Sequence, residues 1–213
     1  MNFILNGFIK IGQEEHINAL YNEGLIHCNT LKYFKELENN VERRDEREGA
    51  IRSLPINKLQ IKDRDKFVPI NLTKGTMHLF DDDLYLTRVF CLFTIKPEHA
   101  TGKVFIDSCN QEFGPKMLLI NNPDEFINRV KSSLDKMQVK YKLRPVCYYD
   151  EDTHQSQLTV FHKPARFKHQ SEFRLHIELK GDGKPFQFKI GSIADIAQIL
   201  DSSVIPKLTI QKV

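Results

Sequence analysis

The chain has 213 residues, of which 40% are hydrophobic and 28% are charged, an ordinary composition for a globular protein. Its length suits one sizeable domain better than two. The formal net charge of +3 is too small to indicate a nucleic-acid partner by itself. Because the four cysteines form no Cys-x-x-Cys pair, a zinc knuckle or a disulfide framework is not expected. Without a signal peptide or an apolar run of membrane-spanning length, we expect a cytoplasmic protein with no membrane partner.

Hydrophobic patterning predicts alternating strands and short helices in the first part of the chain. Acidic residues open the first helix, where the helix dipole favours them, and Gly24 is a typical stop. Asn29 or Thr30 is suited to cap a second helical turn. The expected elements are a strand over residues 3–12, a helix over 13–24, a strand over 25–30 and a helical turn over 31–37.

A highly charged run over residues 39–49 ends in glycine. Such a run is usually a solvated surface loop. Its arginines, Arg44 and Arg47 among them, could also grip phosphates, with Asp45 and Glu48 orienting them. Both interpretations stay open at this point.

The strongest apolar run covers residues 84–95 and predicts a central strand. Asn122 and Pro123 then open a helix that should end near Met137 and bury it. We expect one α+β domain over residues 1–213, with mixed or antiparallel central sheets and a few flanking helices. The remaining expected elements are short strands or loops over 51–80, strands over 105–107, 117–120, 139–149, 158–162, 172–179 and 186–191, a helix over 192–200 and a strand over 208–213.

The strand from Glu172 is the most informative stretch, because polar and apolar residues alternate along it without a break. One face is apolar and belongs in the core. The other carries Glu172, Arg174, His176 and Glu178, which suit either a solvated sheet face or a site. Only Glu172 and Arg174 lie close enough to the preceding basic connector to share a site, so we expect His176 and Glu178 to be solvated.

Several common chemistries lack their motifs. The sequence contains no Gly-x-x-x-x-Gly-Lys-Ser/Thr loop, no Gly-x-Gly-x-x-Gly turn and no Gly-x-Ser-x-Gly elbow. Its histidines have no ligand spacing on an expected helix, which disfavours a zinc hydrolase. What remains is a carboxylate-centred site on strands, with arginines and aromatic residues nearby.

Two stretches of the chain resemble a mostly uncharacterised family of bacterial and phage-borne proteins. That family begins with Phe-x-Lys, a helix and an Asp-x-x-Glu-Gly loop, matched here at Lys10 and at residues 45–49. Late in the chain it has Phe-x-Lys, an aromatic residue and Gln-x-Glu-Phe-Arg, matched here over residues 161–174.

The layout also resembles, more distantly, the ADP-ribosyltransferase superfamily, including its DNA-modifying members. The Gly24-Leu25 step and the late Glu172-Phe173 pair after Arg166 carry this resemblance. The superfamily has a histidine or arginine in the first strand, which here is either Lys10 or displaced to His16, and the serine-rich second motif is absent. The resemblance implies an ADP-ribosyltransferase-like fold that uses NAD as a substrate, without a metal.

The resemblance also implies roles for individual residues. Glu172 would be the catalytic carboxylate, and Tyr33 or its neighbour Phe34 would stack on nicotinamide. The residues expected to bind NAD are Lys10, Asn29, Tyr33, Arg44, Arg47, Gln170 and Arg174. The residues expected to bind the acceptor are Lys163, Arg166, Phe167 and Lys168. Cationic side chains that bind phosphates, together with an aromatic ring that stacks on bases, are typical of proteins that bind single-stranded nucleic acids.

The expected function is that of a toxin or phage-defence effector that modifies nucleic acid (RNA or DNA) or protein, with a neutralising antitoxin or a chaperone as a further partner. Two alternatives stay open. The first is a non-catalytic module that binds nucleic acid or protein through the same charged residues. The second is a metal-dependent nuclease that uses Asp45, Glu48 and Glu172.

Overall fold

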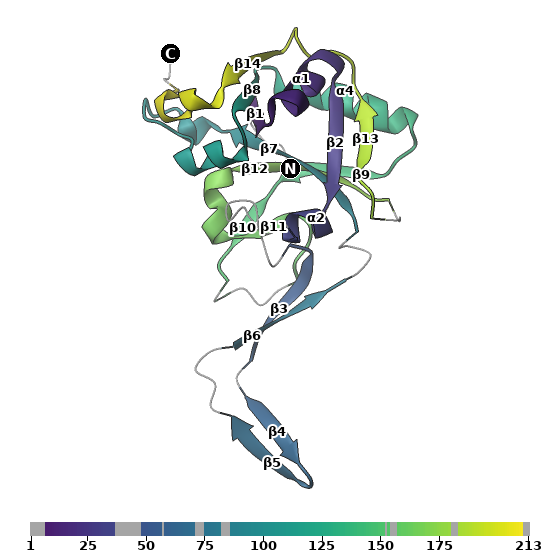
Figure 1. The fold of residues 1–213 in the computed structure, drawn as a ribbon, viewed down its shortest axis with the longest axis vertical. Coiled ribbons are helices and arrows are strands. Elements are labelled where there is room, and N and C mark those ends of the chain that lie inside the picture. The colour runs from purple at the N-terminus through teal and green to yellow at the C-terminus, as the bar shows by residue number, and fades with distance from the viewer. Residues whose placement is uncertain are drawn as a thin grey trace.

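A computed structural model describes the chain over residues 7–36, 48–56, 58–70, 75–81, 86–151, 153, 157–179 and 183–210. It is an α+β structure, rich in antiparallel strands and with few helices, as the patterning predicts. A body built on one large sheet carries a long arm of paired strands that projects from it (Figure 1). No helix of the described residues is both long and apolar enough to cross a membrane.

The body is organised around an eight-stranded sheet whose strand pairs are antiparallel. Its main path runs β13-β2-β7-β1-β8-β14, and β12 pairs with both β7 and β9. The strands are β1 (Gly7–Gly12), β2 (Leu25–Thr30), β7 (Arg88–Ile95), β8 (Lys116–Ile120), β9 (Tyr141–Pro145), β12 (Glu172–Ile177), β13 (Phe186–Lys189) and β14 (Ala197–Asp201).

The sheet splits along one edge of β7. At one end of this edge β1 pairs with Phe93, Thr94 and Ile95, and at the other end β2 pairs with Arg88 and Val89. In the described registers, neither strand pairs with residues 90–92 on that edge. The opposite edge of β7 is covered by β12 without interruption. β1 and β2 therefore diverge and leave the middle of β7 open on one side.

Two helices cover one face of this sheet, α1 (Glu14–Glu23) and α4 (Pro123–Lys136). The Asn122 side chain accepts a hydrogen bond from the Glu125 N–H, so the predicted cap of α4 is confirmed. Gly24 ends α1 in the left-handed conformation, with φ of 63°. The core between helices and sheet contains Ile17, Leu20, Phe126, Val130, Leu134, Phe8, Leu118, Phe173 and Leu175.

Short helices and strands cover the other face. They are α2 (Leu31–Lys35), η1 (Pro97–His99), η2 (Ser108–Phe113), η3 (Ala165–Gln170), η4 (Ser202–Lys207), β10 (Cys147–Tyr149) and β11 (His162–Pro164). Thr30 caps α2 by accepting from the Tyr33 N–H, as the sequence predicts. The parallel pair β10-β11 lies over the part of β12 that carries Glu172 and Arg174, so this face of β12 is covered.

Several sequence predictions are wrong. Residues 105–107 and 158–161 are not part of a strand. Residues 197–201 form a strand on the edge of β8 and not part of a helix, because pairing with β8 outweighs the local helical pattern. The strand expected over 139–149 breaks at Val146, whose N–H donates to the Glu172 carbonyl. Met137 follows the last turn of α4 and is exposed. His176 was expected to be solvated but is 6% exposed, because both faces of β12 are covered.

The arm consists of two strand ladders. We call β3 (Ala50–Ile56) with β6 (Gly75–Phe80) the base ladder, and β4 (Leu59–Asp63) with β5 (Lys66–Ile70) the tip ladder. The base ladder joins the body, where the Leu158 N–H donates to the Ile51 carbonyl. The tip ladder extends away from the body (Figure 1).

Replacing Gly24 by alanine should destabilise the fold by more than the roughly 1–2 kcal/mol that a left-handed alanine costs. The added Cβ would lie 2.0 Å from the Gly191 carbonyl oxygen, so the backbone must shift. Gly102→Ala is the matched control, because Gly102 has a φ of 72° but its Cβ would meet nothing within 4 Å. Urea denaturation of both variants measures the difference. Equal losses would contradict the close approach of Gly24 to Gly191.

Candidate active site

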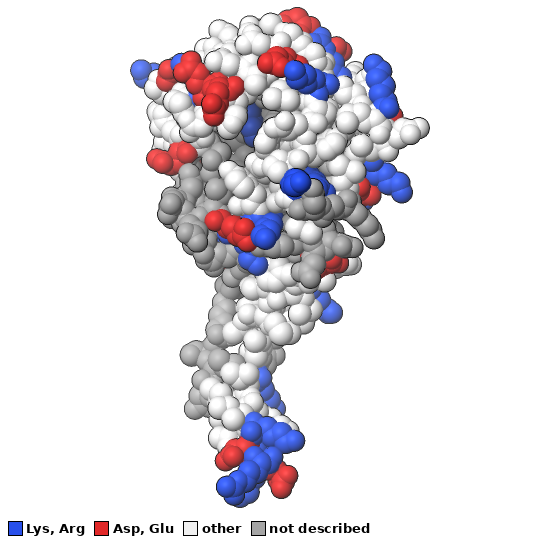
Figure 2. All heavy atoms as spheres, turned by 45° about the vertical axis from the view of Figure 1, so that its right-hand side comes forward, with Lys and Arg blue, Asp and Glu red and all other residues white. Residues whose placement is uncertain are grey.

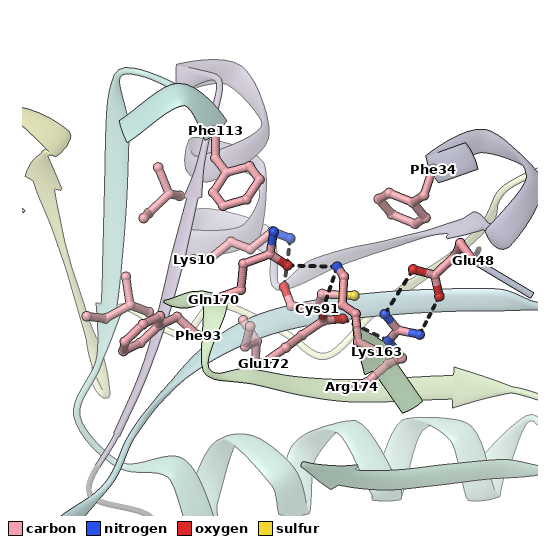
Figure 3. A pocket seen from close by; sticks show the side chains of 13 residues that line it. Lys10, Phe34, Glu48, Cys91, Phe93, Phe113, Lys163, Gln170, Glu172 and Arg174 are labelled. Carbon is pink, nitrogen blue, oxygen red and sulfur yellow. Dashed lines mark hydrogen bonds and ion pairs between the residues drawn. The ribbon is translucent and has the colours of Figure 1, made fainter. Parts of the chain in front are cut away.

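A cavity of about 110 Å³ lies at the split in the sheet, where β1 leaves β7. β1 contributes Lys10 to its lining, β7 contributes Cys91, and β12 contributes Glu172 and Arg174. Lys163 of β11 reaches in from the covering layer. Figure 3 shows these side chains pointing toward one another from separate elements. The strands of the sheet thus build the floor, and the small elements above them build the wall.

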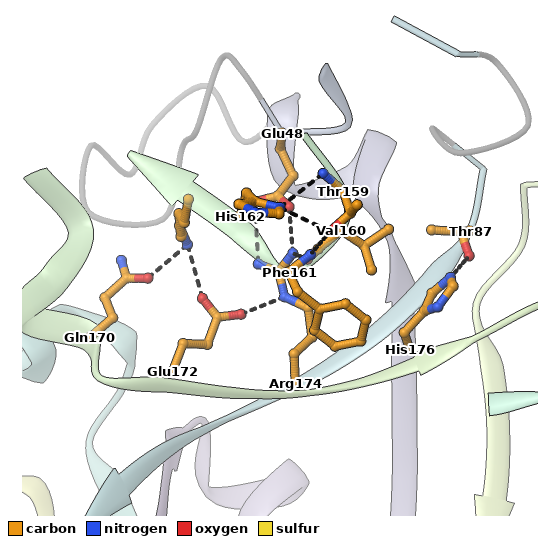
Figure 4. Close-up of polar contacts among 11 residues, drawn as sticks. Glu48, Thr87, Thr159, Val160, Phe161, His162, Gln170, Glu172, Arg174 and His176 are labelled. Atoms are coloured by element: carbon orange, nitrogen blue, oxygen red, sulfur yellow. Dashed lines mark hydrogen bonds and ion pairs between the residues drawn. The ribbon is translucent and has the colours of Figure 1, made fainter. Parts of the chain in front are cut away.

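Arg174 is the centre of the polar contacts and is 1% exposed. Its Nη1 lies 2.7 Å from Glu48 Oε1 and its Nη2 lies 3.5 Å from Glu48 Oε2, while its Nε donates to Glu172 Oε1 at 2.8 Å. Nη1 also donates to the Val160 carbonyl (Figure 4). Burial opposes the charge, but Glu172 and Glu48 raise the pKa of Arg174 well above its ordinary value. The guanidinium therefore holds two buried carboxylates in fixed orientations.

Glu172 is an ionised carboxylate held between two cations. Its second oxygen, Oε2, lies 3.2 Å from the Nζ of Lys163, which also donates to Gln170 Oε1 at 2.7 Å. Burial alone would raise the pKa of Glu172, but Arg174 and Lys163 together hold it well below its usual range. At neutral pH the cavity therefore presents a negatively charged carboxylate, even though Glu172 is only 5% exposed.

Lys10 lies at the point where the strands diverge. Its Nζ donates a hydrogen bond of 2.8 Å to the carbonyl of Cys91. Cys91 belongs to the part of β7 that pairs with neither β1 nor β2. It also lies 4.6 Å from the centre of the Phe90 ring. Burial, with a further contribution from Glu172, raises the pKa of the Cys91 thiol to about 12. Cys91 is therefore a protonated thiol at neutral pH and a poor nucleophile.

The charges in the cavity do not cancel. Among the described residues that line it, three cations and two carboxylates leave one excess positive charge. The aromatic rings of Phe34, Phe93 and Phe113 supply apolar wall. This combination suits a ligand that brings a flat or apolar group together with hydroxyls or an anionic group.

The motif residues converge on this one cavity. Five predicted site residues line it, and all come from the two stretches that carry the family resemblance. Glu48 of the Asp-x-x-Glu-Gly loop binds Arg174 of the late motif, so segments far apart in the sequence meet in one ion pair. The predicted residues that line the cavity are Lys10, Lys163, Gln170, Glu172 and Arg174.

Other predicted site residues do not line the cavity. The side-chain oxygen of Asn29 accepts a hydrogen bond from His27 Nε2 at 3.0 Å. Tyr33 is 44% exposed, so Phe34 is the ring that reaches the lining. Phe167 is buried, with the cationic ends of Lys163 and Arg166 each 4.8 Å from its ring centre, and does not present a free stacking face. Arg166 also pairs with Glu151, and Lys168 is exposed on the surface. Arg44, Arg47 and Asp45 lie outside the described residues.

Several lining residues were not predicted as site residues. Glu48 was considered as a phosphate-orienting group and in the nuclease alternative, and Cys91, Phe93 and Phe113 were assigned no role in a site. The signal that could have selected Glu48 is its place in the Asp-x-x-Glu-Gly loop that carries the family resemblance. No comparable pattern in the sequence indicates Phe113, because η2 folds back over β1 through tertiary contacts. Within the described residues there is no cluster of three His, Cys, Asp or Glu side chains that could hold a metal ion.

Comparisons of the chain with protein-family models, with curated proteins and with solved structures found no match. Its function therefore has to be argued from the residues of the cavity.

Replacing Arg174 by methionine should lower the free energy of unfolding by about 3–5 kcal/mol, because it leaves two buried carboxylates without their shared cation. Arg166→Met is the control. Arg166 is half exposed and pairs with Glu151, an ion pair expected to contribute about 0–1 kcal/mol. Chemical denaturation measures both values. If the two variants lose the same stability, Arg174 does not organise the site.

The unfolding free energy should fall as the pH is lowered from 6.5 toward 4. Burial lowers the pKa of His176 from 6.5 to about 4, so in this window the unfolded chain binds a proton that the folded chain does not. The loss is on the order of 3 kcal/mol, with a further contribution from His99, whose pKa burial also lowers. His176→Gln should flatten the profile in this window, measured by urea denaturation at each pH. Glu172 acts in the same direction only below its ordinary pKa of 4.5. An unchanged slope in the variant would contradict the assignment.

Proposed function

We propose that this protein is an ADP-ribosyltransferase-like enzyme that cleaves the bond between nicotinamide and ribose in NAD. The observation that carries the proposal is Glu172, a buried and ionised carboxylate in the lining of a cavity at the sheet split. An ionised carboxylate is the group needed beside a ribose that develops positive charge. The resemblance of the two motif stretches to that superfamily supports the same assignment.

In the proposed reaction the bond between the ribose C1′ and the nicotinamide nitrogen breaks, and its electron pair leaves with the nicotinamide. The ribose becomes oxocarbenium-like and is then attacked by an oxygen or nitrogen atom of the acceptor, which loses a proton. Glu172 stabilises the positive charge. Its Oε2 is the oxygen for which a ribose hydroxyl competes with Lys163, because that 3.2 Å contact is the longer of the two ion pairs of Glu172. Arg174 keeps the carboxylate in a single orientation.

The size of the cavity limits which part of NAD enters it. Sites that enclose a whole drug-sized ligand usually measure about 300–1,000 Å³, and this cavity measures about 110 Å³. We therefore infer that the nicotinamide and its ribose enter, with Phe34 or Phe113 beside the ring, and that the adenosine end lies outside. Lys10 and the excess positive charge suit the diphosphate.

The biological role that we propose is that of a toxin or phage-defence effector that modifies nucleic acid or protein, with an antitoxin or a chaperone as a possible neutralising partner. This part of the proposal is supported by the resemblance alone. The acceptor-binding surface expected from Lys163, Arg166 and Phe167 receives no support from their contacts, because each of the three contacts other side chains of the protein.

Incubation of the protein with NAD and a mixture of RNA, DNA and protein should release nicotinamide. Glu172→Gln keeps the size of the side chain and removes its charge, so the rate should fall by about 10²–10³-fold. Glu178→Gln is the matched control, because Glu178 follows the same strand and pairs with the exposed Lys142. Release is measured by chromatography, with circular dichroism to verify folding. Absence of NAD consumption with every acceptor would refute the proposal.

One observation favours a second candidate, a non-catalytic binding module. Both oxygens of Glu172 are already engaged by cations, the arrangement of a structural ion network. In this case expression of the protein and of Glu172→Gln would have the same effect on growth, and no NAD would be consumed.

The third candidate, a metal-dependent nuclease, has less support, since Glu48 is bound to Arg174 in place of a metal. Nuclease activity abolished by a chelator would favour it.

A further inference from the structure

The charges around Glu172 differ in position from many other charges of the protein. Figure 2 shows lysines, arginines and acidic side chains on the surface, several of them at the end of the arm. Glu172, Arg174 and Lys163 are instead buried, and none of them is more than 5% exposed. Buried charges keep their geometry only if the backbone that carries them is fixed. The contacts of the Glu172 backbone therefore matter for the site.

Glu172 lies beyond the end of one neighbouring strand. β7 pairs with β12 from Glu172 to Ile177, whereas β9 pairs with β12 only from Phe173 onward. β9 ends at Pro145, and the chain then enters β10 in the layer that covers this face. In the described registers, no strand therefore completes the β9 edge beside Glu172.

The hydroxyl of Tyr148 completes this edge. Backbone groups of successive residues point to opposite edges of a strand. The Ser171 carbonyl accepts from the Thr94 N–H of β7, so the backbone groups of Glu172 face the β9 edge. There the Glu172 carbonyl accepts from the Val146 N–H at 2.9 Å. The Glu172 N–H donates to the hydroxyl oxygen of Tyr148 at 2.8 Å, so a phenol replaces the carbonyl that a longer β9 would have supplied.

Tyr148 also belongs to the layer that covers Glu172. It lies in β10 and is paired in the parallel register with Lys163 of β11. Next to it, the Cys147 N–H donates to the Phe161 carbonyl and ties the two strands together. Lys163 contacts the carboxylate of the same Glu172. Two paired residues of the covering layer therefore hold Glu172, Lys163 by its side chain and Tyr148 by its backbone.

The Tyr148 hydroxyl acts as a neutral acceptor. Burial, with a further contribution from Glu172, raises the pKa of this hydroxyl above its ordinary value of 10. It therefore keeps its proton at neutral pH and accepts from the Glu172 N–H through an oxygen lone pair. Tyr148 is not among the described residues that line the cavity, so it can affect a ligand only through Glu172.

We propose that Tyr148 is a positioning residue that fixes the Glu172 carboxylate against the reacting ribose. Its effect on the rate rests on the proposed cleavage of NAD. Without the hydroxyl, the Glu172 N–H loses its partner, and one hydrogen bond is left to hold this backbone on the β9 edge. A displacement of about 1 Å in a catalytic group can lower the rate by about 10²-fold, because alignment is needed most in the transition state.

Tyr148→Phe removes the hydroxyl and keeps the ring, so the fold should be retained, which circular dichroism verifies. We expect kcat for NAD cleavage to fall by about 10–100-fold, with KM within about twofold of the wild type. Tyr141→Phe is the matched control. The Tyr141 hydroxyl donates to Asp135 Oδ1 at 3.0 Å, and Tyr141 pairs with Ile177 at the far end of β12, so kcat should not change. Equal kcat values for the two variants, or a loss confined to KM, would overturn the role of Tyr148.

Alkylation of Cys91 reports the position of the carboxylate without NAD. The Cys91 thiol donates to Glu172, and Glu172 adds to the effect of burial in raising the pKa of this thiol. A displaced carboxylate should therefore speed alkylation of Cys91 by iodoacetamide by about threefold or more, measured by mass spectrometry of peptides. Buried Cys28 is the internal reference, because a general loosening of the fold would speed both thiols.

The two measurements separate the role of Tyr148 from the proposed function. If the wild type cleaves no NAD, the proposed function is wrong, and the ratio of the Cys91 and Cys28 rates alone tests Tyr148. An unchanged ratio in Tyr148→Phe then overturns its positioning role. If the wild type cleaves NAD and Tyr148→Phe keeps both its kcat and this ratio, cleavage stands and Tyr148 does not position Glu172.

Discussion

The buried ion pairs of Arg174 hold the body together at the point where its layers meet. Arg174 rises from the central sheet, Glu172 lies two residues before it, and Glu48 comes from the segment that leads into the arm. The same guanidinium binds the carbonyl of Val160, next to the segment that crosses over the sheet. A buried charge without its partner lowers the stability of the fold. None of these segments can therefore move away without exposing a charge or leaving it unpaired in the interior. The site is thus also the connection between sheet, cover and arm.

The split in the sheet explains why a cavity exists at this place. A continuous strand beside β7 would have saturated the backbone of residues 90–92, and side chains would have filled the space. Here β1 and β2 diverge, and the Lys10 ammonium binds the exposed Cys91 carbonyl in place of a strand. A polar side chain thus satisfies a backbone group inside the sheet. The result is an opening lined by strands, whose side chains are held more rigidly than those of loops.

The sequence predicted local features well and tertiary packing less well. The cap at Asn122 and the stop at Gly24 depend on neighbouring residues, and each appears where the pattern indicated. The central strand expected over residues 84–95 is present over Arg88–Ile95. Alternation along one strand put Glu172 on a polar face, and the resemblance of the late motif selected it from the other polar residues. The same alternation led to the wrong prediction that His176 is solvated. A period of two shows that one face of a strand is polar, but it does not show whether another layer covers that face. Phe113 and β14 depended on distant segments, which no local pattern encodes.

The energetics of the ion network favour a functional interpretation over a purely structural one. Taking three charged side chains from water costs several kcal/mol for each ion, and well-packed apolar residues of similar volume often give a fold that is at least as stable. The body has an apolar core on both faces of its sheet without Arg174, Glu172 and Glu48. Packed apolar residues in place of the whole network would therefore serve stability as well, whereas a fixed carboxylate facing a cavity requires a cation to hold it. The ion pair with Arg174 fixes the orientation of the Glu172 carboxylate. The longer contact between Lys163 Nζ and Glu172 Oε2 leaves that oxygen as the one for which a ligand hydroxyl can compete.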